Sequence, residues 1–141
     1  MKQQLETLSR LARLRASRVR EVLGRIQYQQ NLCQRYRNNI EGLARLCSYE
    51  APLGTSLQRD NYQRYQGTLY KMMELQRREL AVAEGTLARI QQELLQAMRS
   101  EKVVTHLIET KFSQWQELLA RQEQKLQDAM AAQAWWRHRL S

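Results

Sequence analysis

The chain contains two histidines and two cysteines, side chains suited to acid-base and nucleophilic catalysis. On one straight helix, a rise of about 1.5 Å per residue would place His106 and His138 about 48 Å apart, too far to share a site within one chain. Cys33 and Cys47 would be about 21 Å apart, beyond the reach of a disulfide. Both cysteines occupy apolar positions of a repeat, where a thiol is usually a small buried hydrophobe. We therefore expect no catalytic residue and no metal site.

Four of the five glycines, Gly24, Gly42, Gly67 and Gly85, are scattered singly through the helical pattern, without the clustering that cradles a phosphate. The apolar pattern described next leaves a thin seam in place of a globular core, and no architecture that forms a pocket. We expect the chain not to be an enzyme, and to bind no nucleotide, cofactor or small-molecule substrate.

The elements that carry these residues are defined by apolar side chains that recur at alternating steps of three and four. A strict repeat of seven over such a length predicts a left-handed coiled coil. The first seam comprises Leu5, Leu8, Ala12, Arg15, Val19, Val22, Ile26, Gln29, Cys33, Tyr36, Ile40, Leu43 and Cys47. The second comprises Leu69, Met73, Gln76, Leu80, Ala83, Leu87, Ile90, Leu94, Ala97, Glu101, Val104, Ile108, Lys111, Trp115 and Leu118.

The only proline, Pro52, lies in the one turn-like stretch of the chain and forbids a continuous helix there. Ser56 or Asp60 can cap the amides that open the second helix. The sequence therefore predicts an all-α fold, a long antiparallel two-helix coiled coil, or helical hairpin, in which helix two is longer than helix one. We expect one unit over residues 1–141, with helix one at about 3–48, the turn at about 49–56 and helix two at about 57–137. The alternative is one unbroken dimeric rod kinked at Pro52.

The two predicted helices differ in length, so part of helix two has no partner within the chain. If the turn is centred near Pro52, helix one covers helix two only to about residue 105. An uncovered apolar helix face is sticky in water. We expect a partner protein, a self-association contact or a folded-back tail to cover it. The exposed residues would include Leu107, Ile108, Phe112, Trp115, Leu118, Leu119, Trp135 and Trp136.

Positive charge is concentrated in the first predicted helix. Residues 1–48 hold ten Lys or Arg against three Asp or Glu, a net charge of +7 out of +9 for the whole chain. This basic collar can be a solvated surface, a docking surface for an acidic protein, or a site for nucleic acid or lipid. Arginine supplies eighteen of the 23 basic residues and suits bidentate contacts with carboxylates. No motif that reads a nucleic-acid groove and no aromatic stacking platform accompanies the collar.

Short stretches around the turn resemble one known family. They are Tyr36-Arg37-Asn38-Asn39-Ile40 before the turn, Asn61-Tyr62-Gln63-Arg64-Tyr65-Gln66-Gly67-Thr68-Leu69 after it, and Leu5-Glu6-Thr7-Leu8 at the start. Together with the length and helical pattern of the whole chain, these stretches resemble the flagellar export protein FliJ family.

The resemblance implies a non-enzymatic part of the flagellar type III protein export apparatus, similar to the central stalk of rotary ATPases. Such a stalk inserts into the export ATPase hexamer, promotes its assembly, contacts the export gate membrane protein FlhA and escorts export chaperones. The implied location is cytoplasmic, peripherally associated with the inner membrane at the flagellar base. A start at Met1-Lys2-Gln3-Gln4 without an apolar leader is in keeping with this expectation.

The resemblance also implies binding residues. Those that match the gate-binding and chaperone-binding surface are Gln29, Leu32, Tyr36, Tyr65, Leu69, Met72 and Gln76. Tyr36 and Leu69 also lie on the predicted seams, so either can be a packed core residue. Because both chain ends lie at one pole of a hairpin, we expect the collar and the tryptophans of helix two to meet there and bind the ATPase. The ATPase-binding residues are then Arg10, Arg13, Arg18, Arg20, Arg25, Trp135 and Trp136.

Other functions fit the same pattern. The chain can be the counterpart of this stalk in a virulence-type injectisome, a generic coiled-coil scaffold that pairs through helix two beyond residue 105, or a rod associated with nucleic acid.

Overall fold

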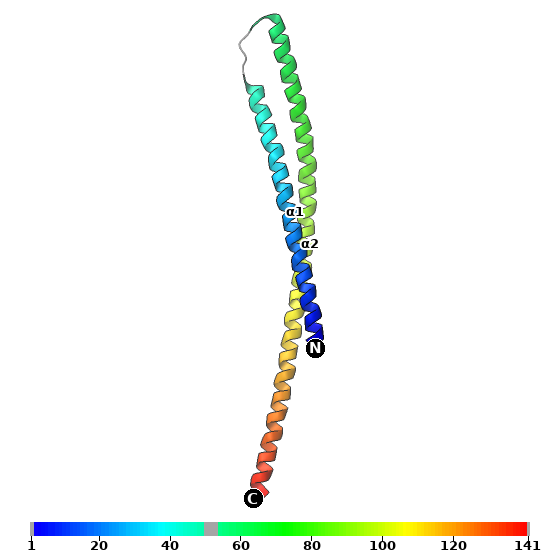
Figure 1. Ribbon diagram of the computed structural model, residues 1–141, viewed down its shortest axis with the longest axis vertical. Coiled ribbons are helices and arrows are strands. Elements are labelled where there is room, and N and C mark those ends of the chain that lie inside the picture. Colours follow the sequence, from blue (N-terminus) through cyan, green and yellow to red (C-terminus); the bar gives the residue numbers. More distant parts are fainter. Residues whose placement is uncertain (1, 50–53, 141) are drawn as a thin grey trace. The chain divides into compact units, whose positions relative to one another are not determined.

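The computed structural model describes residues 2–49 and 54–140, and it contains two helices (Figure 1). Helix α1 spans Lys2–Ser48 and helix α2 spans Ser56–Leu140. They form an all-α helical hairpin in which α2 is the longer helix, so the predicted fold class is confirmed. Pro52 lies outside the described residues. The hairpin packs as two units, one made of residues 19–96 and the other of residues 1–18 and 97–141.

In the unit of residues 19–96, one line of side chains on each helix forms the interface. Val22 and Cys33 of α1 are fully buried, and Leu69, Met73, Ala83 and Ile90 of α2 are almost fully buried. Val22, Ile26 and Ile90 form a core cluster against which Leu87 and Leu94 pack. All of these residues belong to the seams expected from the repeat of seven, because that spacing keeps one helix face directed toward its neighbour.

Polar pairs beside this seam set the antiparallel alignment of the two helices. Arg25 Nη1 donates to Glu93 Oε2 at 2.6 Å, and Arg37 Nη2 donates to Glu84 Oε1 at 3.0 Å. Both ion pairs are partly exposed to solvent, so each adds little to the free energy of unfolding. Their value lies in specifying which residues face each other across the hairpin.

The ends of the helices near the turn are closed by side chains. The Tyr62 hydroxyl donates to the Tyr49 carbonyl, and Gln66 Nε2 donates to the Cys47 carbonyl at 3.3 Å. These bonds satisfy carbonyls at the end of α1 that have no partner within the helix.

Helix α2 begins with a capping box formed by Thr55 and Gln58. The backbone N–H of Gln58 donates to Thr55 Oγ1 at 3.3 Å, and the backbone N–H of Thr55 donates to Gln58 Oε1 at 3.0 Å. A Cβ atom at Gly54 would lie 1.5 Å from Gln58 Oε1, so glycine leaves room for this reciprocal contact. The expectation that Ser56 or Asp60 caps the helix was wrong, because the pair three residues apart satisfies two backbone donors at once.

The unit of residues 1–18 and 97–141 continues the same kind of pairing. Val104 is buried, and Ala97, Ile108 and Trp115 are half-buried. Lys111 lines a hollow together with Gln3, Gln4, Thr7 and Leu8 of α1. Helix α1 therefore covers α2 to about residue 115, ten residues beyond the predicted limit near residue 105.

The predicted limit fell short because the pairing is not symmetric about Pro52. A turn centred there would place Cys47 beside Leu57, yet the Cys47 thiol lies 3.8 Å from Met73 Sδ. The first turns of α2 extend past the end of α1, as Figure 1 shows. Each residue of α1 consequently faces a residue of α2 that lies closer to the C-terminus than a turn centred on Pro52 would place it.

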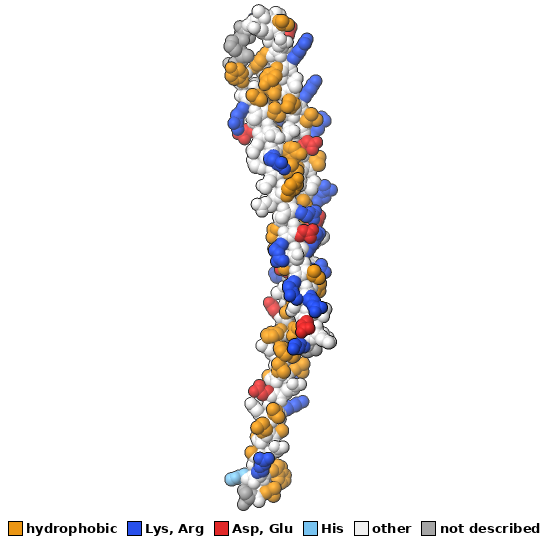
Figure 2. All heavy atoms as spheres, in the orientation of Figure 1, with side chains coloured by type: hydrophobic (Ala, Val, Ile, Leu, Met, Phe, Trp, Pro, Cys, Tyr) orange, Lys and Arg blue, Asp and Glu red, His pale blue; other side chains and the backbone are white. Residues whose placement is uncertain are grey.

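Beyond residue 115, every described side chain of α2 is exposed. Figure 2 shows hydrophobic side chains distributed along this stretch. Since α2 continues as one helix to Leu140, the stretch does not fold back on itself, and that expectation was wrong. The apolar surface of residues 116–140 is left without a partner inside the chain.

We predict that Ile90→Ala lowers the free energy of unfolding by about 2–5 kcal/mol, because it opens a cavity beside Val22 and Ile26. Chemical denaturation followed by circular dichroism measures this change. Leu14→Ala is the matched control, since Leu14 is 68% exposed and its loss should change stability by about 0.5 kcal/mol or less. Equal effects of the two substitutions would contradict the assigned seam.

Candidate partner-binding surfaces

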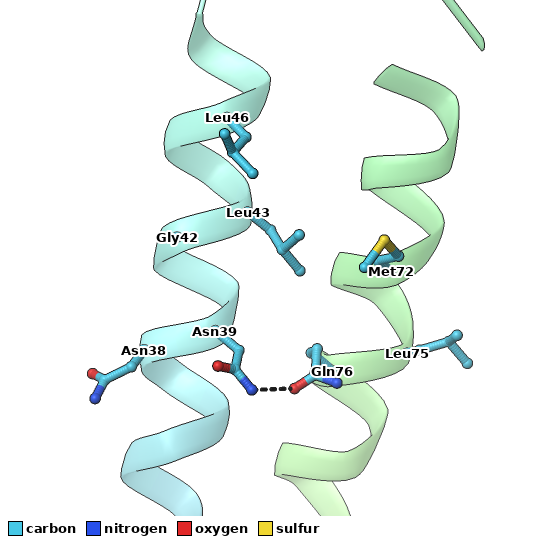
Figure 3. Close-up of a pocket in the computed structure, with 8 residues that line it drawn as sticks. All are labelled: Asn38, Asn39, Gly42, Leu43, Leu46, Met72, Leu75 and Gln76. Atoms are coloured by element: carbon cyan, nitrogen blue, oxygen red, sulfur yellow. Dashed lines mark hydrogen bonds between the residues drawn. The ribbon is translucent and has the colours of Figure 1, made fainter. Parts of the chain in front are cut away.

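A groove between α1 and α2 lies in the unit of residues 19–96 and has a volume of about 560 Å³ (Figure 3). Its lining residues are Asn38, Asn39, Gly42, Leu43, Leu46, Met72, Leu75 and Gln76. In Figure 3, Leu43 and Met72 point toward the space between the helices, and Asn39 Nδ2 donates to Gln76 Oε1 at 3.1 Å.

The groove is apolar at its centre and open to solvent. Leu46, Met72 and Leu75 each expose close to half of their side chains. Gly42 contributes no side chain, and nothing lies within 4 Å of the position that a Cβ atom would occupy. A helix face that lacks a side chain allows another surface to approach the backbone closely. The groove can therefore accept an apolar side chain from a partner, with the Asn39 and Gln76 amides at its edge.

Two of the residues predicted to bind the gate or chaperones are buried in the hairpin interface. Gln29 is 8% exposed, and its Nε2 donates to the Ala83 carbonyl at 3.0 Å. Leu69 is 4% exposed. Neither side chain can touch a partner while the helices remain paired, so a role in binding would be indirect.

The other five predicted gate-binding residues are accessible to different extents. Met72 and Gln76 come together in the groove, and Tyr65 is exposed. Leu32 and Tyr36 are half-buried on α1. The predicted set is therefore not one continuous surface, because its members alternate between the seam and the flanks of the hairpin.

Of the groove residues, only Met72 and Gln76 were predicted to bind a partner, and the six that the sequence reasoning missed include Leu46 and Leu75. Their signal was present, since Leu46 and Leu75 are apolar residues that lie outside the predicted seams. An apolar residue off the seam of a two-helix coiled coil is directed to solvent and is a candidate for binding.

The predicted ATPase-binding arginines are all exposed, but they differ in their surroundings. Arg10, Arg13 and Arg18 belong to the unit that contains the chain ends, whereas Arg20 and Arg25 belong to the unit of residues 19–96. Arg25 is engaged with Glu93, and the hydrogen bond and negative charge of Glu93 raise the pKa of the Arg25 guanidinium above its usual value. Arg25 thus already has an anionic partner within the chain.

The predicted tryptophans form an aromatic cluster near the end of α2. The rings of Trp135 and Trp136 meet edge to face, with centroids 5.4 Å apart and planes inclined by 82°. The Arg139 guanidinium lies 5.0 Å from the centre of the Trp135 ring, within the range of a cation–π contact. Both indoles remain more than half exposed, so this cluster is available to a partner.

The tryptophans do not meet the arginines of α1, as the sequence reasoning expected. Lys111 of α2 faces Leu8 of α1, and Trp135 is about 36 Å further along the helix at a rise of about 1.5 Å per residue. The expectation failed because α2 continues as a single helix past the end of its pairing with α1. The tryptophans and the arginines of α1 therefore do not form one joint surface.

Several chemistries find no support in the part of the chain that the structure describes. Residues 2–49 and 54–140 contain no group of three or more His, Cys, Asp or Glu side chains that could hold a metal ion. Over the same residues, neither helix has a segment long and apolar enough to cross a membrane. Cys33 is buried and Cys47 is half-buried, as expected for thiols in a seam.

A two-helix hairpin with an open groove and an unpaired helical extension defines a coiled-coil protein that acts through its surfaces. The model of the flagellar FliJ protein family matches residues 1–140, and the chain belongs to this family. The resemblance noted in the sequence is thereby confirmed, and it makes the chain a component of flagellar protein export. No curated protein and no solved structure matches the chain significantly.

We predict that Gln29 supports the hairpin and does not bind a partner directly. Gln29→Leu should keep the free energy of unfolding within about 1 kcal/mol of the wild-type value, because leucine leaves no buried donor and the Ala83 carbonyl lies within α2, where the helix supplies a backbone donor. Gln29→Ala should lower it by about 1–3 kcal/mol, because it removes packing as well as the hydrogen bond. Thermal unfolding measures both, and a larger loss for Gln29→Leu than for Gln29→Ala would contradict this role.

Proposed function

We propose that the chain is a non-enzymatic stalk that inserts into the export ATPase hexamer and promotes its assembly. The observation that carries this proposal is the unpaired part of α2, in which residues 116–140 are exposed. A single α-helix is about 10–12 Å across with its side chains, which is narrow enough to enter the centre of a protein ring. Family membership supplies the biological setting.

The tail has the composition of a binding element. Trp135 and Trp136 are large aromatic side chains of the kind that dominate interface energetics. Leu126 and Met130 lie one helical turn apart, and each is about 60% exposed. In water this surface costs free energy, and insertion into an apolar or mixed ring lining would recover it.

The second part of the proposal concerns coupling to the export gate. We propose that FlhA or an export chaperone binds at the groove, where Met72 and Gln76 are accessible, and on the adjacent exposed Tyr65 side chain. A gate protein in the inner membrane would hold the chain at the membrane periphery.

ATP hydrolysis by the export ATPase of the same organism tests the first part directly. Added chain should raise hydrolysis and hexamer formation together and saturate at one chain per hexamer. No change in either quantity, with the chain shown to be helical, would overturn the stalk proposal. Light scattering of the chain alone distinguishes a scaffold that pairs through its tail, because that protein would be a dimer.

We predict that glutamate in place of Arg10, Arg13 and Arg20 weakens binding to the ATPase by about tenfold or more, since about 1.4 kcal/mol corresponds to a factor of ten. These arginines are exposed, and a charge reversal there leaves the seam intact. Arg25 is left unchanged because its substitution would also break the contact with Glu93.

The matched control reverses the charge of three exposed arginines on α2, Arg59, Arg64 and Arg77. It produces the same change in net charge, so a general electrostatic effect would weaken both variants equally. Equal loss in the two variants would remove the basic collar from the mechanism.

The groove gives a separate prediction. Met72→Asp should weaken binding of the cytoplasmic part of FlhA or of a chaperone by about tenfold, because it places a charge in the apolar centre of the contact. Val82→Asp is the control, since Val82 is 66% exposed and lies outside the groove. Isothermal titration calorimetry measures both, and unchanged affinity for Met72→Asp would contradict binding at this site.

A further inference from the structure

The arginines of the hairpin fall into two kinds when their partners across the interface are compared. In the unit of residues 19–96, Arg25 and Arg37 of α1 each contact a carboxylate of α2, from Glu93 and Glu84. In the unit that contains the chain ends, Arg15 of α1 instead shares a pocket with Arg99 of α2. This pocket is therefore lined by two arginines, whereas Arg25 and Arg37 of α1 are each paired with a glutamate of α2.

Neither arginine of this pocket is neutralised within the part of the chain that the structure describes. Arg15 and Arg99 form no ion pair with a described residue. The residues three and four positions from each on its own helix, which are the ones close enough to pair, include no Asp or Glu. The nearest seam carboxylate along the chain, Glu101, is half-buried and does not line the pocket.

The remaining wall of the pocket indicates what kind of anion it suits. Ser100 provides a hydroxyl, and Val103 and Val104 provide an aliphatic surface. Val104 is buried, whereas Val103 is 60% exposed and lines the same pocket as the two arginines. The volume of about 290 Å³ accommodates one or two side chains. An inorganic phosphate would use the cations and leave the valine surface uncovered.

We propose that Arg15 and Arg99 form a clamp for a carboxylate of a partner protein, presented on a helix beside an aliphatic side chain that packs on Val103. Arginine forms bidentate hydrogen bonds with carboxylates, and two guanidinium groups can hold both oxygens of one Asp or Glu. A bound carboxylate also supplies negative charge to a pocket that is lined by two cations. The proposal rests on the proposed function in taking the export ATPase as the partner that supplies this carboxylate.

The test compares the full-length wild-type chain with a double variant, Arg15→Gln and Arg99→Gln, for binding to the export ATPase of the same organism. Fluorescence anisotropy of the labelled chain reports the affinity. The double variant should bind about tenfold or more weakly, and its affinity should depend less steeply on salt concentration. Arg64→Gln with Arg77→Gln is the control, because it removes the same charge from exposed positions outside the pocket.

Gln variants that fail to fold would also bind weakly, so circular dichroism and thermal unfolding accompany each measurement. Removing two like charges from one exposed pocket should leave the melting temperature unchanged or raise it. A double variant that melts at the wild-type temperature and still binds tenfold more weakly supports the clamp. Wild-type affinity in the double variant overturns it.

Two further outcomes separate the sources of failure. If the wild-type chain itself does not bind the ATPase, the proposed function fails and the clamp fails with it. If the wild-type chain binds and the double variant binds equally, only the clamp fails.

Tight binding of inorganic pyrophosphate to the wild-type chain, lost in the double variant, would assign the pocket to a phosphate group and overturn the carboxylate proposal.

Discussion

The seam between α1 and α2 is the interaction on which the rest of the structure depends. A hairpin of two helices has no second layer, so each buried side chain is buried by the facing helix alone. The core cluster of Val22, Ile26 and Ile90 shows how few residues do this. Because the interface is narrow, most hydrophobic side chains outside it stay exposed, and the chain presents long surfaces to other proteins.

This constraint also explains why the ends of the two helices differ. Where α1 covers α2, the apolar face of α2 is satisfied within the chain. Past residue 115 the same helix continues without cover, although its sequence still supplies leucine, methionine and tryptophan. The exposed apolar surface follows from unequal helix lengths, and it is the physical reason for expecting a protein partner at this end.

The seam could be predicted from the sequence because the repeat of seven depends only on local spacing. Every hydrophobic residue that is buried among the described ones occupies a predicted seam position. The register could not be predicted in the same way, since it depends on contacts such as Cys47 with Met73 and Asn39 with Gln76 between distant segments. Because the predicted register was wrong, the paired region was expected to end near residue 105, whereas it ends near residue 115.

The accessibility of the proposed binding residues could not be predicted, because a single sequence does not distinguish a functional residue from one that packs. Gln29 and Leu69 were expected to bind a partner from the resemblance alone, and the hairpin buries both. Leu46 and Leu75 line the groove. The repeat of seven does not include them, so the sequence indicated only that they are apolar residues outside the seam.

The same distinction applies to charge. Net charge counts Arg15 and Arg25 alike, but Glu93 neutralises Arg25 across the hairpin, whereas Arg15 shares a pocket with a second arginine, Arg99. A positive surface can recruit an acidic partner only through cations that the fold has left without an anion, because a cation already paired must give up its partner to form a new contact. The register of the hairpin, which sets these pairings, therefore also decides which part of the basic helix is available for binding.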